Sequence, residues 1–146
     1  MGVVCAKDRY TWVLVEGTSI AMAQLIERKV VKIPADVREN ELAWVRRDFT
    51  ELLVSLAPES VVIQAVGGSP NGISDATVAR VEVEGVIRSV LGELGVPGKS
   101  IKKVSLASAF GIKRDEFEEL QNSIDLIAQA PKSHRPELLL AVSQLG

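Results

Sequence analysis

The sequence predicts a single α/β domain built on one mixed sheet, in which a three-stranded antiparallel meander is followed by α-β-α-β-α, with helices on both faces. Three features of the 146 residues predict this order. Short β-rich apolar runs open the chain, a long helical repeat of apolar residues follows, and an unbroken apolar run comes directly after that helix. A composition of 47% hydrophobic and 25% charged residues supplies enough apolar side chains for one globular core.

The meander is predicted over residues 3–6, 11–15 and 29–33. The first two runs are separated by the charged segment 7–10, which is typical of a hairpin with a charged tip. The third run, Lys-Val-Val-Lys-Ile, ends at Pro34, a residue that cannot donate to a paired neighbour.

Residues 39–57 are predicted to form the first helix, because their apolar side chains recur at helical spacing with charged residues on the opposite side. Pro58 ends this helix. The run at 60–66, Ser-Val-Val-Ile-Gln-Ala-Val, is typical of a strand that is buried on both faces. It is therefore the predicted centre of the sheet.

The second half of the chain continues the alternation. A helix is expected from Asp75, its predicted cap, to about residue 94, and a strand over 101–106. An amphipathic helix over about 114–130 and a last apolar helix over 136–145 follow.

Composition excludes several classes of function. Because the chain has a single cysteine, Cys5, an internal disulfide framework and a cysteine-rich zinc site are excluded. We expect Cys5 to be a small, buried apolar side chain. Aromatic residues are only 4% of the chain, which excludes a platform of exposed rings for single strands. No leader and no membrane-spanning run is evident, so we expect a cytoplasmic location and no membrane partner.

The net charge of −2 hides a segregation of charge along the chain. From 99 to 114 every charge is basic, and from 115 to 125 every charge is acidic. The basic block predicts a patch that contacts nucleic-acid phosphates. The alternative explanation of the charge segregation is that the acidic residues stabilise the N-terminal turns of the following helix through its dipole. The predicted nucleic-acid-binding residues are Lys99, Lys102, Lys103, Lys113 and Arg114.

Together with the element order, segments 3–17, 61–64, 71–95 and 104–120 resemble a ribonuclease H-like domain, and specifically its Holliday-junction resolvase branch. The most resolvase-like stretch is Val-Glu-Val-Glu-Gly-Val-Ile at 81–87. The resemblance implies carboxylates that converge on two divalent cations, Mg²⁺ or Mn²⁺, which clamp the attacking and leaving oxygens of a phosphodiester.

At the positions that the resemblance assigns to these carboxylates, the sequence mostly lacks them. Cys5 and Ala6 occupy the first-strand position, Gln64 the end of the central strand, and Glu137 the last helix. An amide oxygen can ligate a cation but brings no charge. The leading hypothesis is therefore a degenerate metal site in a non-catalytic module that binds nucleic acid or is structural, with no cofactor expected.

Two alternatives remain. An active nuclease would use Asp8, Glu84 and Glu137 as catalytic residues, with Gln64 and Glu137 as metal ligands. Each of these acids also has a purely structural explanation: Asp8 in a solvated turn, Glu84 on a solvated helix face and Glu137 in the first turn of a helix. The other alternative is an oligomerising interaction domain, for instance a homodimer, with residues 138–145 and Trp44 as interface candidates. The glycine-rich loop 67–72 could cradle a phosphate or simply connect a strand to a helix.

Overall fold

The computed structural model describes residues 1–67 and 71–146. Its sheet has five strands in the order β3-β2-β1-β4-β5. β1 pairs antiparallel with β2 and parallel with β4, β2 pairs antiparallel with β3, and β4 pairs parallel with β5. The predicted mixed sheet with its opening meander is confirmed. The strands are β1 (Gly2–Cys5), β2 (Arg9–Glu16), β3 (Gln24–Lys32), β4 (Val61–Ala65) and β5 (Gly98–Lys102).

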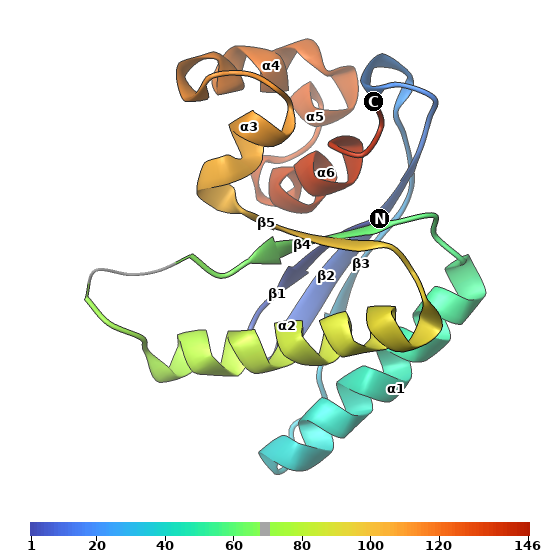
Figure 1. Cartoon of the computed structure of the whole chain (residues 1–146), viewed down its shortest axis with the longest axis vertical. Helices are drawn as coiled ribbons and strands as arrows, with labels where there is room; N and C mark the ends of the chain where they lie inside the picture. The colour runs from blue at the N-terminus through green and yellow to red at the C-terminus, as the bar shows by residue number, and fades with distance from the viewer. Residues whose placement is uncertain (68–70) are drawn as a thin grey trace.

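Helices cover both faces of this sheet, as predicted (Figure 1). Two long helices, α1 and α2, lie on one face, and the short helices α3 to α6 lie on the other. The helices are α1 (Arg38–Leu56), α2 (Asp75–Leu94), α3 (Leu106–Ala109), α4 (Phe117–Ser123), α5 (Asp125–Ala128) and α6 (Arg135–Val142), and short 3₁₀ turns are η1 (Ile20–Met22), η2 (Lys103–Ser105), η3 (Arg114–Glu116) and η4 (Lys132–His134). No helix in the described part of the chain is long and apolar enough to cross a membrane.

Strand alternation divides the core between the two faces. Val3 and Ile63 pack in the cluster beneath α1 and α2. Val62 and Ile101, on the opposite face, pack with Leu140 of α6. The strands β1 and β4 are therefore buried on both sides, which explains their unbroken apolar runs.

The last helix belongs to this core. Leu138, Leu139 and Leu140 are each at most 4% exposed. α6 lies directly on β1. The two backbones are so close that a Cβ at Gly2 would collide with the carbonyl oxygen of Glu137 and come within 2.9 Å of the Ala141 nitrogen. Trp44 is half-buried against the core on the other face. A homodimer stays a prediction, and the apolar side of α6 is not its interface.

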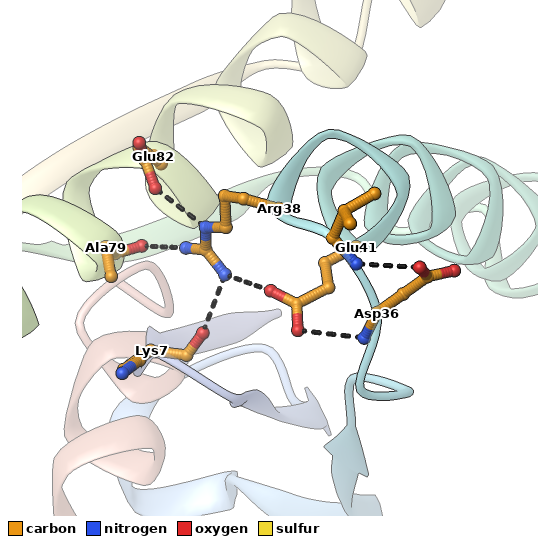
Figure 2. A network of polar contacts seen from close by, with 7 residues as sticks. Lys7, Asp36, Arg38, Glu41, Ala79 and Glu82 are labelled. Carbon is orange, nitrogen blue, oxygen red and sulfur yellow. Dashed lines mark hydrogen bonds and ion pairs between the residues drawn. The ribbon is translucent and has the colours of Figure 1, made fainter.

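Arg38, at the start of α1, ties three parts of the fold together (Figure 2). Its guanidinium donates to the carbonyl oxygen of Lys7 at the hairpin tip, to the carbonyl oxygen of Ala79 and the carboxylate of Glu82 on α2, and to Glu41 within α1. Burial lowers the pKa of Arg38, but the hydrogen bonds to the Glu41 and Glu82 carboxylates together outweigh it, so that the pKa is raised. Arg38 thereby fixes the tip of the β1–β2 hairpin against both long helices.

Several details differ from those predicted: β3 begins at Gln24 rather than at 29, and β1, rather than the run at 60–66, is the central strand of the sheet. The last strand, β5, covers 98–102 rather than 101–106, because β4 pairs with it from Gly98 to Lys102 and residues 103–105 form η2 before α3 begins at Leu106. The helix expected over 114–130 is broken into η3, α4 and α5, because Ile124 adopts an extended backbone between α4 and α5. Ser74, rather than Asp75, caps α2, and its side chain accepts the backbone N–H of Thr77.

Candidate functional site

A cleft of about 690 Å³ opens on the α6 face of the sheet, where the chain leaves β4 and β5. Val4 of β1 and Gln64 of β4 lie at the sheet side of the cleft. The connection after β5, the helix α4 and the start of α6 form its walls. Its lining residues are Val4, Gln64, Lys103, Val104, Leu106, Ala107, Arg114, Phe117, Glu118, Gln121, Lys132, Arg135, Pro136 and Leu139.

Four cations and one carboxylate line this cleft. Lys103, Arg114 and Lys132 are exposed, and Arg135 is half-buried. The Arg135 guanidinium donates to the carbonyl oxygens of Ala130 and Ala128 at 3.5 and 3.4 Å, which holds it beside the α6 N-terminus. Because Glu118 is the single acid among the lining residues, the cleft carries an excess of positive charge and favours an anion.

The sheet side of the cleft is uncharged. Pairing of Gly2 with Val62 and of Val3 with Ile63 brings Val4 alongside Gln64. The sequence places Cys5 and Ala6 at this position, and the structure corrects this: β1 ends at Cys5, and the Ala6 N–H already closes the hairpin turn on the Arg9 carbonyl oxygen. A valine thus stands beside Gln64.

The Gln64 side chain makes no hydrogen bond to any residue in the described ranges 1–67 and 71–146, whereas its backbone carbonyl accepts one from Arg80 at 3.5 Å. Its amide therefore offers an oxygen acceptor and an NH₂ donor to whatever occupies the cleft.

Glu137, the carboxylate expected on the last helix, does not line the cleft although its neighbours in α6 do. Its side chain is only 3% exposed, and Arg28 of β3 donates to it from Nε at 2.6 Å. Since Arg28 pairs with Val13 of β2, the carboxylate is engaged on the β3 side of α6.

Glu84 lies on α2, on the other face of the sheet, and is buried. It accepts the backbone N–H of Val66 at 3.3 Å and lies 3.8 Å from the Arg88 guanidinium. Burial, together with the Glu84 carboxylate and against the opposing effect of Arg80, raises the pKa of the Cys5 thiol to about 12. Cys5 is a free, buried cysteine, as expected.

Asp8 lies at the exposed hairpin tip and pairs with Arg9 at 3.2 Å. Its backbone carbonyl accepts the N–H of Ile33, and the neighbouring Lys7 is held by Arg38, so the tip is fixed. The structure therefore keeps Asp8, Glu84 and Glu137 in three separate environments. Among the described residues, no three histidine, cysteine or carboxylate side chains are grouped so that they could hold a metal ion.

The predicted basic block is only partly gathered at the cleft. Lys103 and Arg114 line it, whereas Lys99 and Lys113 do not. Lys102 follows Ile101, which faces α6, and so points to the opposite face of the sheet.

Sequence reasoning missed Lys132 and Arg135, which enter the cleft from η4 and the start of α6. The signal was present in the segment Pro-Lys-Ser-His-Arg-Pro, where two cations stand three apart between two prolines that confine the chain to a turn. The glycine-rich loop predicted over 67–72 lies partly outside the described residues, which omit 68–70.

Neither a protein-family model nor a curated protein matches this sequence. Solved structures do match. RuvC from T. thermophilus in complex with a Holliday junction substrate aligns with a TM-score of 0.72 at 18% identity, covering 97% of this chain and 88% of that chain. A second Thermus thermophilus RuvC structure aligns at 0.70, with 21% identity over 97% and 90%.

The yeast mitochondrial Holliday junction resolvase Ydc2 aligns with a TM-score of 0.67 at 10% identity, covering 99% of this chain and 76% of that chain. The identities are low, and the similarity extends over nearly the whole chain. The protein therefore has the α/β, ribonuclease H-like fold of these resolvases, with the sheet order 3-2-1-4-5.

Proposed function

We propose that this resolvase-like protein binds nucleic acid through phosphates held in the cationic cleft, and that it does so without metal-dependent cleavage. One observation carries the proposal: Lys103, Arg114, Lys132 and Arg135 surround a sheet position occupied by Val4 and Gln64. Side-chain cations thus line the cleft around the sheet position where the resolvase resemblance would place carboxylates with bound dications.

The donor set at this position does not fit a pair of divalent cations. Mg²⁺ and Mn²⁺ are held by several oxygen ligands, carboxylates above all. Val4 offers no donor atom, Gln64 offers one neutral oxygen, and the Glu137 carboxylate is neutralised by Arg28. A site with these side chains lacks the negative charge that would retain two dications.

The same side chains suit phosphate binding directly. Each Lys or Arg that contacts a backbone phosphate releases counterions. The slope of log association constant against log salt concentration therefore becomes more negative by about 0.7 to 0.9 for each contact. Nucleic acid as the ligand class is supported by the similar RuvC structure, which contains a Holliday junction substrate.

The test is fluorescence anisotropy with labelled single-stranded, duplex and four-way-junction DNA, first in EDTA and then in Mg²⁺ or Mn²⁺. We expect binding that is unchanged by EDTA and weakened by salt, with no cleavage products on a denaturing gel. Metal-dependent cleavage that is lost in Glu137→Gln would overturn the non-catalytic assignment and favour the nuclease.

The chain offers a matched pair of variants for the binding surface. Lys103→Gln and Lys102→Gln remove adjacent exposed lysines, one in the cleft and one on the opposite face of the sheet. Lys103→Gln is expected to weaken binding severalfold and to lower the salt slope by about one contact, whereas Lys102→Gln leaves both unchanged. Equal effects of the two substitutions would contradict the assignment of the cleft as the phosphate site.

A further inference from the structure

The cleft changes in character from its rim to its interior. Lys103 and Lys132 are exposed, whereas Val4 and Gln64 are half-buried and Leu106 and Leu139 are buried. Three of the four cations, Lys103, Arg114 and Lys132, are thus exposed, whereas Arg135 is half-buried and the fully buried part of the lining is apolar. A ligand with an anionic end would place that end on the cations at the rim, and an uncharged, flat end would fit against the apolar interior.

Two amides supply the polar groups of the interior. The Gln64 side chain has no hydrogen-bond partner in the described part of the chain. Gln121 donates its Nε2 to the Phe117 carbonyl oxygen at 3.4 Å, which orients its amide along α4. Glutamine amides pair with the edges of nucleobases, because each presents a donor and an acceptor side by side.

From this arrangement we infer that the cleft takes one unpaired nucleotide of a nucleic-acid strand, with its base against the apolar interior and the Gln64 amide and its flanking phosphates on Lys103 and Lys132. The inference rests on the proposed function, since it specifies what enters the same cleft. The volume of about 690 Å³ falls in the range of small-molecule sites, roughly 300 to 1,000 Å³.

A fully paired duplex would use only the outer part of the cleft. Its bases are stacked and their pairing edges are occupied, so it could lay phosphates on the lysines but could not reach Gln64 without unstacking. An already unpaired base avoids that cost. The structure therefore predicts a preference for a displaced or bulged nucleotide over intact duplex.

The preference can be measured with three labelled duplexes of the same length, one carrying a single bulged adenine, one an abasic site in the bulge, and one fully paired. Anisotropy is measured in EDTA at fixed salt. We expect the bulged adenine to bind on the order of tenfold more tightly than the abasic bulge. Gln64→Leu should remove most of this difference.

Two further variants control for altered folding and for loss of charge. Gln129→Leu makes the same change at an exposed position outside the cleft and should preserve the preference. Gln64→Glu keeps the side-chain shape but removes both amide donors, and should lose the preference as Gln64→Leu does. Lys103→Gln should weaken all three probes by similar factors.

Equal binding of the adenine and abasic probes by the unmodified protein would overturn the inference. If Lys103→Gln still weakened both probes, the phosphate-binding function would stand without the base pocket. If Lys103→Gln had no effect either, the proposed function would fail together with the inference.

Discussion

Replacing Arg28 with Met should show whether Glu137 is committed to holding the fold. The Glu137 side chain is 3% exposed and that of Arg28 is 20% exposed, with Nε and Oε1 2.6 Å apart. Removing the guanidinium leaves a buried carboxylate without its cation, which typically costs about 3 to 5 kcal/mol. We expect a loss of about 3 kcal/mol, because water can reach the solvent-facing side of Arg28 and partly replace the guanidinium.

Urea denaturation followed by circular dichroism at neutral pH measures this loss. The double variant Arg28→Met with Glu137→Gln should recover most of it, because no buried charge is left unpaired. Arg9→Met is the matched control: the Asp8–Arg9 pair is exposed on both sides, so the change should stay within about 1 kcal/mol. A loss below about 1 kcal/mol in Arg28→Met, or no recovery in the double variant, would refute the structural role of the pair.

Three further predictions concern the fold and its titrations. Burial raises the pKa of the Cys5 thiol from 9.0 to about 12, so the stability that depends on the neutral thiol is fully present below pH 9 and is lost as the pH rises towards 12. The total loss of unfolding free energy over this window is up to about 4 kcal/mol, and the slope of unfolding free energy against pH should be smaller in Cys5→Ala. Hydrogen bonds from Arg38 and from the Asp36 N–H lower the pKa of Glu41, so its contribution is present above its ordinary value of 4.5 and lost as the pH falls; thermal melts of Glu41→Gln should depend less on pH in the acid range than those of the unmodified chain. Gly2→Ala should destabilise the protein by about 3 kcal/mol or more, because its Cβ would collide with α6, whereas Gly85→Ala on α2, where nothing lies within 4 Å, should stabilise it by up to about 1 kcal/mol; equal melting temperatures for the two variants would contradict the packing of α6 on β1.

The element order could be predicted because it depends on local patterns. The apolar run at β4 and the helical repeat at α1 are each contained in one segment, and their type follows from periodicity and from the prolines that end them. The β5 boundary could not be found in this way. Its residues Lys99 and Ser100 look like loop in isolation, and they form a strand because β4 supplies hydrogen-bond partners along its whole length.

The candidate site was harder to predict because it depends on which face each side chain takes. A shift of one residue in β1 decides whether Val4 or Cys5 stands beside Gln64, and strand alternation sends these two side chains to opposite faces of the sheet. Lys132 and Arg135 line the same cleft as Lys103 because α6 packs on β1, β2 and β4 and so places η4 and its own start beside the cleft. No local pattern contains either fact.

The partner of Glu137 illustrates the same limit and bears on the chemistry. Glu137 and Arg28 are 109 positions apart in sequence, and only the packing of α6 across β1 and β2 brings the carboxylate to the edge strand. A carboxylate in the first turn of a helix is an ordinary metal-ligand candidate until its counter-ion is known. Once Arg28 is placed, retaining a dication would require the chain to give up a buried ion pair, and Val4 and Gln64 offer no compensating charge. The excess of cations in the cleft and the neutralised glutamate therefore both fit the proposed function, in which the positive charge facing a phosphate would come from side chains rather than from bound metal.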